Sequence, residues 1–365
     1  MIVNSEEIVL KVGFEIHQQL LTKTKLFCNC NCLEPENYDS YFFRKLRPAQ
    51  SELGSYDQAS IFEFSKMRTI KYYSSFESSC LVEADEEPPH SINSEALETA
   101  LIISLALSSK IVDEINVMRK IVIDGSNTSG FQRTMLMSLG GYLEVDNKKV
   151  GVQSICLEED SGKLISDDGN IKEYGLDRLG IPLIEIALEP VTGTPSEIMK
   201  IALTLGRLLR ASKRVARGIG SIRQDVNISI NNGIGIVEVK GVQRLEQLIK
   251  VIEYESIRQH GLLLIAEKLK KERIAEKIIA DNVRELTHIF INSQSKTVKK
   301  ILSNSNHSIK AIRVKNFKGF FSYEPYPNIR IGKQLGELVR FYGFGGIFHS
   351  DELPNYGITE KEVDK

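Results

Sequence analysis

The sequence predicts an α+β protein with a large β-rich domain followed by a smaller α+β module. From residue 8 to about residue 240, short β-branched runs alternate with glycine-containing turns, which is typical of strands. From Gln243 to about Phe290 the pattern is helical and charged, and from Ile309 it becomes β- and aromatic-rich again. We therefore expect one domain over residues 1–260 and a second over residues 261–365, the second beginning with a helical connection.

Composition limits what such a protein can be. The 365 residues suffice for two domains of roughly 150 residues or more, and a hydrophobic content of 42% excludes a mainly disordered chain. A net charge of −1 excludes a uniformly basic surface, so a nucleic acid would have to bind a local patch. No apolar run approaches the roughly 18 residues that span a bilayer, and the first seven residues do not resemble a leader peptide. We expect a cytoplasmic protein without a membrane partner.

Strands and helices follow in order along the first domain. Five runs have the length and β-branched content of strands, and in chain order they are Ile8–Phe14, Arg119–Ile123, Val150–Cys156, Ile181–Leu188 and Arg223–Ile230. Asn93 can cap a buried helix over Ala96–Leu107. Thr194 and Glu197 can form a capping box around Pro195, which predicts a second helix to about Leu209.

The charged stretch after Gln243 carries apolar residues at helical spacing. They form three groups, which are Leu245, Leu248, Ile249 and Ile252, then Leu264, Ile265 and Leu269, then Ile274, Ile278 and Ile279. We expect helices here that lead into the second domain, whose aromatic residues begin at Phe317.

Glu15 and His17 of the first strand are candidates for chemistry. Side chains two residues apart on a strand point to the same face. A carboxylate beside an imidazole can share a metal ion or move a proton. The alternative is a solvated glutamate next to a hydrogen-bonded histidine.

Further carboxylates occur in later strands. Glu158, Glu159 and Asp160 directly follow a β-rich run, and three adjacent acids repel one another unless a cation lies among them. An exposed acidic turn is the alternative. Glu185 lies inside an apolar strand and needs a partner, which a cation shared with Glu159 or an arginine would supply.

The strand around residue 225 adds a polar face. Alternation places Arg223, Asp225 and Asn227 together, and Glu238 and Lys240 repeat the pattern in the next run. Oxygen ligands favour Mg²⁺, and Mg²⁺ beside arginine and lysine suits phosphoryl transfer. The sequence contains neither a P-loop motif nor the glycine motif of dinucleotide-binding folds.

The loop between Asp124 and Arg133 is rich in glycine and hydroxyl residues. Loop amides and hydroxyls of this kind can bind a phosphate or a carboxylate. An ordinary turn is the alternative.

A run of three cysteines, Cys28-Asn29-Cys30-Asn31-Cys32, lies in the first domain, with Cys80 farther along. Thiols this close suggest zinc. The alternative is a set of reduced, partly buried thiols, because no second cysteine pair completes a standard four-ligand motif.

One basic stretch stands out in a chain of balanced charge. No acid interrupts its six cations, which are Arg207, Arg210, Lys213, Arg214, Arg217 and Arg223. They predict either a surface that contacts nucleic-acid phosphates or cations that a helix C-terminus favours through its dipole.

Longer motifs identify a family that the chain resembles. They are Gly13–Leu20, Lys25–Cys30, Arg44–Pro48, Ser51–Gly54, Val82–His90, Met118–Arg133, Leu157–Asp160, Asp177–Ile186 and Arg223–Asn227. They resemble the GatB/GatE family of glutamyl-tRNA(Gln) amidotransferase subunits, and the archaeal GatE type more than the bacterial GatB type. Gly319–Thr359 is similar to the insertion domain that GatE shares with bacterial-type aspartyl-tRNA synthetases. The resemblance covers essentially the whole chain and implies a β-rich cradle domain followed by that insertion module.

The resemblance implies a specific reaction. Family members phosphorylate the side-chain carboxylate of glutamate misacylated onto tRNA(Gln), using ATP and Mg²⁺, and ammonia then displaces the phosphate to give Gln-tRNA(Gln). An asparaginase-like partner, the D subunit, supplies the ammonia to the archaeal enzyme. Family chains normally continue into a helical domain and a tRNA-binding tail domain, so we expect either a fragment or a separate polypeptide that supplies them.

Residue roles follow from the same resemblance. The positions that match the family's metal and catalytic residues, and that we expect to hold Mg²⁺, are Glu15, His17, Glu159 and Glu185. Those that would face the phosphates or the aminoacyl end are Arg119, Lys120, Ser126, Asn127, Thr128, Ser129, Asp225 and Lys240. We expect zinc, if bound, at Cys28, Cys30 and Cys80, and tRNA at Arg207, Arg210, Lys213, Arg214 and Arg217.

Three alternatives remain. One is a non-catalytic RNA-binding or assembly protein, which would have no reason to keep all four catalytic positions. The second is a relative of aspartyl-tRNA synthetases, which would carry class II synthetase motifs that the large domain lacks. The third is a bacterial GatB-type protein acting on Asp-tRNA(Asn) or Glu-tRNA(Gln), which the insertion module disfavours.

Overall fold

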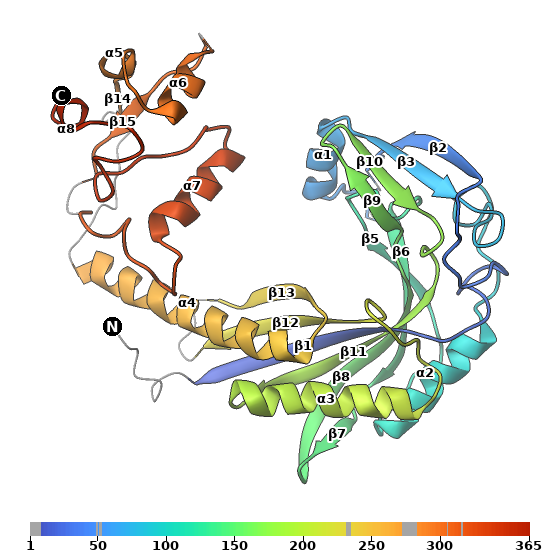
Figure 1. Ribbon diagram of the computed structural model, residues 1–365. Helices are drawn as coiled ribbons and strands as arrows, with labels where there is room; N and C mark the ends of the chain where they lie inside the picture. The colour runs from blue at the N-terminus through green and yellow to red at the C-terminus, as the bar shows by residue number, and fades with distance from the viewer. Residues whose placement is uncertain are drawn as a thin grey trace. The chain divides into compact units, whose positions relative to one another are not determined.

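The computed structural model describes residues 9–48, 50, 53–230, 235–271, 283–304, 306–314 and 317–365, and the chain divides into two compact units (Figure 1). The larger unit comprises Val9–Ile228 and Ile236–Val251. The smaller unit consists chiefly of Ile252–Lys365. Both units mix helices and strands.

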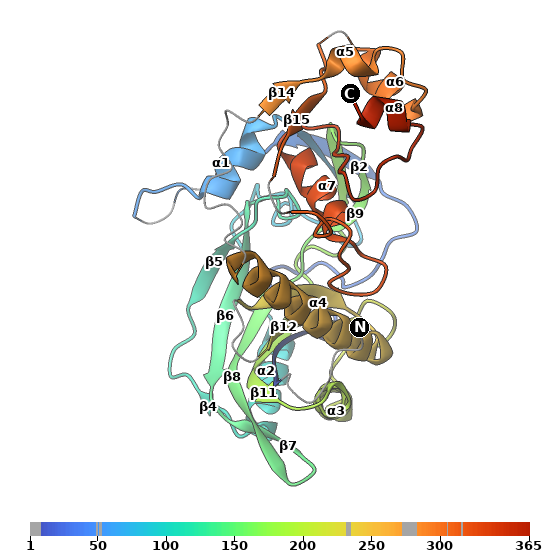
Figure 2. The same cartoon turned by 90° about the vertical axis from the view of Figure 1, so that its left-hand side faces the viewer.

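A nine-stranded sheet forms the centre of the larger unit (Figures 1 and 2). Its strand order is β13-β12-β1-β11-β8-β6-β4, and β5 and β7 pair with β6 and β8 respectively. The pairs β1–β11, β11–β8 and β8–β6 are antiparallel. The strands are β1 (Leu10–Gln19), β4 (Lys110–Ile111), β5 (Val117–Ile121), β6 (Phe131–Leu139), β7 (Tyr142–Val145), β8 (Lys148–Glu159), β11 (Pro182–Thr192), β12 (Ile222–Ile230) and β13 (Val237–Val242).

Alternation along the central strands gives this sheet one apolar face and one polar face. In β1, Val12, Phe14 and Ile16 are buried, whereas Glu15 and His17 point to the opposite side and stay partly accessible. Two helices run along one side of the sheet in Figure 1, α2 (Ser94–Ala106) and α3 (Pro195–Ala211). Helix α2 packs on β8 and β6, and the buried positions of both helices are mostly apolar.

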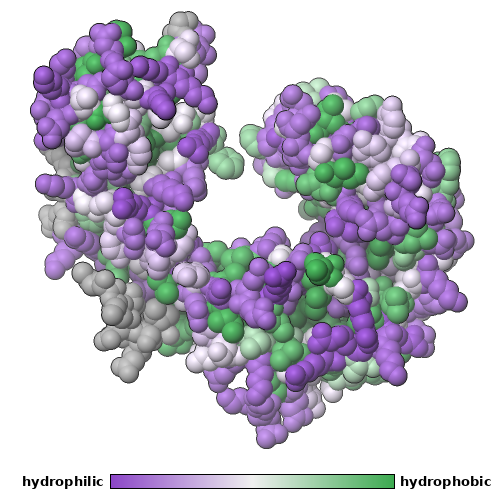
Figure 3. All heavy atoms as spheres, in the orientation of Figure 1, coloured by the Kyte–Doolittle hydropathy of each residue, from purple (hydrophilic) through white to green (hydrophobic). Residues whose placement is uncertain are grey.

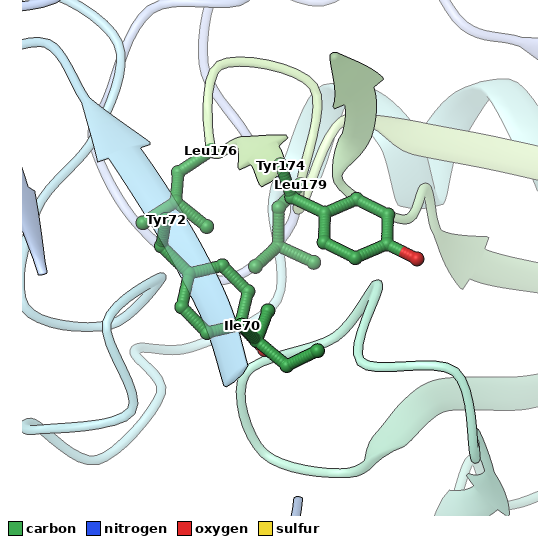
Figure 4. Close-up of a cluster of buried hydrophobic side chains, with 5 residues drawn as sticks. All are labelled: Ile70, Tyr72, Tyr174, Leu176 and Leu179. Atoms are coloured by element: carbon green, nitrogen blue, oxygen red, sulfur yellow. The ribbon is translucent and has the colours of Figure 1, made fainter. Parts of the chain in front are cut away.

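A second, four-stranded sheet lies in the same unit. Its order is β2-β3-β10-β9, formed by Ser40–Lys45, Thr69–Ser74, Ile171–Gly175 and Lys163–Asp167. The β3–β10 pair is parallel, and helix α1 (Gln58–Ser65) lies between β2 and β3 in the chain. One face covers a buried cluster, shown in Figure 4, of Ile70, Tyr72, Tyr174, Leu176 and Leu179.

The smaller unit combines most of a long helix with several short elements. This helix is α4 (Leu245–Lys271), whose last 20 residues belong to the unit. The other elements are β14 (Val283–Glu285), α5 (Thr287–Phe290), α6 (Lys296–Leu302), β15 (Lys310–Ile312), α7 (Ile331–Phe341) and α8 (Glu360–Val363). Strands β14 and β15 pair antiparallel. Among the described residues, no helix is both long and apolar enough to cross a membrane.

The expected mixed α+β fold is confirmed, and the expected β-rich domain contains a large antiparallel sheet. The capping box also forms: the Thr194 hydroxyl accepts from Glu197 N at 3.3 Å, and Glu197 Oε2 accepts from Thr194 N at 2.8 Å. Two expectations are wrong. Val283–Glu285 is a strand rather than part of a helix, and Ile331–Phe341 is a helix within a segment expected to be β-rich. Some expected features lie outside the described residues: Ile8, Ser51-Glu52, Ile274, Ile278 and Ile279.

Helix α7 shows why the second expectation fails. Its aromatic neighbours favour strands as residue types. However, Ile331, Leu335 and Val339 are four residues apart and less exposed than Leu338 and Arg340, so one helical stripe packs inward. Packing of that stripe outweighs the local β propensity.

The central sheet predicts a measurable stability difference. Leu157 of β8 has no exposed surface, so Leu157→Ala should leave a cavity and lower the free energy of unfolding by about 2–5 kcal/mol. Leu139→Ala, at a side chain of β6 that is 49% exposed, is the matched control and should cost less than about 1 kcal/mol. Urea unfolding midpoints measure both, and equal losses would contradict the burial pattern.

Candidate functional site

Four neighbouring strands bring His17 and several carboxylates to the polar face of the large sheet. His17 of β1 lies opposite Glu185 of β11, and Glu158 comes from β8 beyond it. His17 Nδ1 is 2.9 Å from Glu158 Oε1 and 3.9 Å from Glu185 Oε2. On the other side, His17 Nε2 is 3.9 Å from Asp225 Oδ2 of β12. We call these residues, with Glu15, the His17 cluster.

The His17 cluster has the donor chemistry of a divalent-cation site. Two groups of three each place one ligand atom per residue within 4.8 Å of the others: His17 with Glu158 and Glu185, and His17 with Glu15 and Asp225. Carboxylate oxygens with one imidazole suit Mg²⁺ or Mn²⁺. The residues present therefore fit the ion that the sequence predicts.

Electrostatics in the cluster favour a cation. Burial by itself would lower the pKa of His17, but its hydrogen bond to Glu158 and the charges of Glu158, Glu185 and Asp225 produce a net increase. Burial raises the pKa of Glu185, and repulsion from Glu158 raises it further. Crowded carboxylates of this kind are relieved by a metal ion or by protons.

Two lysines lie at the rim of the cluster. Lys120 Nζ is 3.8 Å from Glu185 Oε2, and Lys240 Nζ is 3.1 Å from Asp225 Oδ2 and 2.7 Å from Glu238 Oε1. Both side chains are more than half exposed, at 57% and 67%. Their ammonium groups can therefore reach a ligand that binds over the carboxylates.

The structure contradicts the prediction that Glu159 belongs with Glu15, His17 and Glu185. Adjacent strand residues point to opposite faces, so Glu159 lies on the reverse face of β8. Its Oε1 accepts from Arg133 N at 3.0 Å, and its Oε2 lies 3.1 Å from Arg133 Nη1. Both side chains are buried. Glu158 takes the expected place in the cluster, because the pairing of β8 with β11 puts it on the face of Glu185, and no local pattern sets that register.

Arg119 and the 126–129 loop also do not face the His17 cluster. Arg119 of β5 lies opposite Arg133 of β6 in the strand register, so both side chains point to the reverse face. The Arg119 guanidinium lies 5.6 Å from the Phe131 ring centroid. The loop hydroxyls hold the loop itself: Ser126 bonds to Asp124, Thr128 to the Glu83 carbonyl and Ser129 to the Phe131 carbonyl. Asn127 is buried. The structure therefore does not bring these five residues to the His17 cluster, and their contact with the phosphates or the aminoacyl end stays a prediction.

A pocket of about 590 Å³ opens on this reverse face. Two phenylalanine rings, the His90 imidazole and two guanidinium groups line it with mostly apolar side chains, and the full lining is Phe27, Pro89, His90, Ser91, Ile92, Ile115, Val117, Arg119, Phe131, Arg133 and Met135. The sheet separates this pocket from the His17 cluster, because Lys120 and Arg119 alternate between the two faces.

The cysteine run forms a second candidate metal site. One ligand atom from each of Cys28, Cys30, Cys80 and Glu83 lies within 4.8 Å of the others. Glu83, which sequence reasoning missed, accepts from Cys28 Sγ at 2.9 Å and from Cys80 N at 2.8 Å. The fully buried Lys25 lies 3.8 Å from the same carboxylate. Burial raises the pKa of the Cys80 thiol to about 11, so a metal would have to displace its proton.

The basic stretch divides into exposed and paired cations. Arg214 bonds to Glu98 at 2.9 and 3.2 Å, and Arg223 bonds to Asp160 at 3.1 Å. The exposed members, at or just after the end of α3, are Arg207, Arg210, Lys213 and Arg217.

Comparison with known proteins identifies relatives along nearly the whole chain. A model of the GatB/GatE catalytic domain matches residues 10–333. The E subunit of glutamyl-tRNA(Gln) amidotransferase from Sulfolobus acidocaldarius is 51% identical over 359 residues, which cover 97% of this chain and 56% of the relative. The corresponding protein of Saccharolobus solfataricus is 50% identical over 366 residues, covering 99% and 57%. The chain thus spans little more than half the length of these curated relatives.

The His17 cluster predicts a pH dependence of stability. Because the pKa of His17 is raised above 6.5, its protonated form stabilises the fold fully below about pH 6.5, and this contribution is lost as pH rises through the raised pKa. We expect the melting temperature in EDTA to fall as the pH rises above about 6.5, and to fall less steeply in His17→Gln. The same slope in both proteins would refute this.

Proposed function

We propose, because this chain belongs to the GatB/GatE catalytic-domain family, that it activates Glu-tRNA(Gln) by ATP-dependent phosphorylation and amidates it to Gln-tRNA(Gln). The observation that carries the proposal is the His17 cluster, whose carboxylates and imidazole converge on one face of the central sheet. A protein that only bound RNA would gain nothing from such repulsion among Glu158, Glu185 and Asp225. This activity belongs to translation in the cytoplasm.

The reaction requires two transfers, the first at the γ-phosphorus of ATP and the second at the acyl carbon of the substrate. A carboxylate is a poor acyl donor, so a carboxylate oxygen first takes the γ-phosphoryl group of ATP and ADP leaves. The nitrogen of ammonia then attacks the acyl carbon, the carbon–oxygen bond to phosphate breaks, and the nitrogen loses a proton. Inorganic phosphate and the amide are the products.

The residues of the His17 cluster have separate tasks in this scheme. His17, Glu158 and Glu185 would hold Mg²⁺, which supplies charge neutralisation for phosphoryl transfer when bound. Asp225 faces the second ring nitrogen of His17 and orients the imidazole. Lys120 and Lys240 are placed to bind anionic oxygens of the nucleotide or of the substrate glutamate.

The substrates and partners extend this proposal. An asparaginase-like D subunit would release the ammonia, and Glu-tRNA(Gln) would contact the exposed cations Arg207, Arg210, Lys213 and Arg217. Arg214 contributes less than the sequence predicts, because Glu98 already neutralises it. The ion pair between Arg223 and Asp160 likewise gives Arg223 a structural role.

The domain organisation is also a proposal. We assign residues 1–260 to the catalytic cradle and residues 261–365 to a helical connection and an insertion domain similar to that of bacterial aspartyl-tRNA synthetases. The support is the motif pattern of Gly319–Thr359 and the short mixed elements of the smaller unit.

We further propose a structural zinc ion at Cys28, Cys30, Cys80 and Glu83. Three thiolates and a carboxylate make a complete four-ligand set for zinc. Lys25 beside Glu83 would offset part of the negative charge of that set. No open coordination position is needed, so the ion would stabilise the fold rather than act in catalysis.

The cluster predicts which carboxylate is essential. Glu158→Gln should lower ATP-dependent phosphorylation of Glu-tRNA(Gln) by about 100-fold or more, because it removes a proposed metal ligand that also hydrogen-bonds His17. Glu144→Gln, an exposed carboxylate of β7 in the same sheet, is the control and should retain the rate. Transfer of ³²P from labelled ATP measures both, and a wild-type rate in Glu158→Gln would exclude the site.

The zinc proposal has an internal control in the cysteine run. Purified protein should contain about one zinc per chain, and Cys28→Ser or Cys80→Ser should lose it, because each removes a ligand. Cys32→Ser should keep the zinc, since Cys32 Sγ instead lies 3.5 Å from Thr22 Oγ1. Elemental analysis after dialysis decides, and equal zinc in all three variants would disprove the ligand set.

A further inference from the structure

A buried carboxylate at the end of β8 takes no part in the proposed reaction. Hydrophilic residues cover much of the surface of the larger unit (Figure 3), whereas Asp160 is only 2% exposed. Two cations lie beside it: Arg178 Nε is 3.6 Å from Asp160 Oδ2, and Arg223 Nη2 donates to Asp160 Oδ1 at 3.1 Å. A buried carboxylate persists where charged partners and hydrogen bonds surround it. Asp160 therefore links the segments to which its partners belong.

The partners of Asp160 come from two other strands and from the turn before β11. Asp160 Oδ2 accepts from Gln19 Nε2 of β1 at 2.9 Å, and Oδ1 accepts from Arg223 of β12. Arg178, in the turn, also donates to the carbonyls of Ser161 and Gly162, both at 2.9 Å. We call Asp160, Gln19, Arg178 and Arg223 the Asp160 network.

The Asp160 network lies directly beside the His17 cluster. On three strands, a residue of the network is two positions from a residue of the cluster. The pairs are His17 and Gln19 on β1, Glu158 and Asp160 at the end of β8, and Asp225 and Arg223 on β12. Side chains two residues apart on a strand point to the same face. The network is thus the next row of side chains on the polar face of the sheet.

The fourth strand of the cluster is tied to Asp160 through the backbone. Asp160 N donates to the Ile181 carbonyl at 2.7 Å, and Gly180 N donates to the Asp160 carbonyl at 3.0 Å. Ile181 directly precedes β11, the strand that carries Glu185. Each of the four strands that supply the cluster is therefore held by one residue, close to the position of its cluster side chain.

The cluster needs such a tie because its own charges push the strands apart. Glu158, Glu185 and Asp225 repel one another around His17. In the Asp160 network the charges attract instead, because one carboxylate lies between two guanidinium groups. This attraction opposes the repulsion in the neighbouring row. It also serves metal binding, since ligand atoms must keep their positions within about 0.5 Å to hold an ion.

We propose that Asp160 is a positioning residue for the His17 cluster, which holds β1, β8, β11 and β12 at the spacing in which their side chains can bind a divalent cation. Its own oxygens are engaged by Gln19 and Arg223, so it acts through the ligands and not on the cation. Partners behind the ligands raise metal affinity by keeping the ligand atoms oriented. The inference rests on the proposed function, because that function gives the cluster a cation to hold.

Asp160→Asn tests this role because an amide cannot replace the carboxylate. Both carboxylate oxygens accept hydrogen bonds, whereas the amide nitrogen of asparagine is a donor and would face a donor of Gln19 or Arg223. One link to a neighbouring strand should therefore break. We expect the whole chain to bind Mn²⁺, a paramagnetic substitute for Mg²⁺, about 10-fold or more weakly than wild type. Electron paramagnetic resonance of the free ion measures this affinity.

Two further variants separate positioning from general loss of stability. Asp177→Asn changes another buried carboxylate, whose partner is Tyr38 rather than a strand of the cluster, and should keep the wild-type affinity for Mn²⁺. Gln19→Met removes only the link to β1 and should weaken Mn²⁺ binding by a smaller factor than Asp160→Asn. Thermal melting shows whether each variant folds, and if Asp160→Asn does not, wild-type affinity in Gln19→Met overturns the role.

A metal-free measurement distinguishes this inference from the proposed function. At one fixed pH and without added Mg²⁺ or Mn²⁺, the ¹⁵N chemical shift of His17 Nδ1 reports its hydrogen bond to Glu158. The signal should move in Asp160→Asn and stay in Asp177→Asn, and the spectrum of His17→Gln assigns it. An unmoved signal or wild-type Mn²⁺ affinity in Asp160→Asn overturns the positioning role, as do equal changes in Asp177→Asn. Absence of Mn²⁺ binding by the wild-type chain would instead refute the cation site of the proposed function, and the His17 signal alone would then decide the role of Asp160.

Discussion

The repulsion among carboxylates around one half-buried imidazole is the interaction on which the functional site depends. Glu158, Glu185 and Asp225 approach His17 from three strands, and each has an oxygen within 4 Å of a ring nitrogen. Like charges at such short range destabilise the folded state. The fold can therefore keep these three carboxylates together only if other interactions in the same strands stabilise it. The apolar face of the same strands supplies that stability: Phe14, Ile16 and Leu157 are almost fully buried there.

Strand alternation keeps two kinds of chemistry apart. The polar face gathers ligands that a cation would neutralise, whereas the reverse face buries Glu159 against Arg133, an ion pair that is satisfied within the protein. A buried pair of this type fixes β6 and β8 relative to each other. Because β8 contributes to both faces, the position of Glu158 depends on the packing of its neighbour Glu159.

Local signals in the sequence were sufficient for part of this structure. Glu15 and His17 share a strand face, as alternation requires, and Thr194 caps its helix through Glu197 because both partners are close in the chain. The choice between Glu158 and Glu159 was not available locally, because a shift of one residue exchanges the faces and only the pairing with β11 sets the register. Glu83 is more than fifty residues from Cys28, so its place among the thiols depends on tertiary structure. The same holds for α7, whose inward stripe is decided by packing.

The two ring nitrogens of His17 cannot both act as metal ligands at the same time. Nδ1 faces Glu158 and Glu185, while Nε2 faces Asp225. A neutral imidazole has a single lone pair, so it can be a ligand on one side only and must remain a hydrogen-bond donor on the other. A cation held between Glu158 and Glu185 would therefore make Asp225 the acceptor for the remaining proton. The tautomer of one histidine would thus select between the two candidate ion positions, and an ion at either one would weaken the other.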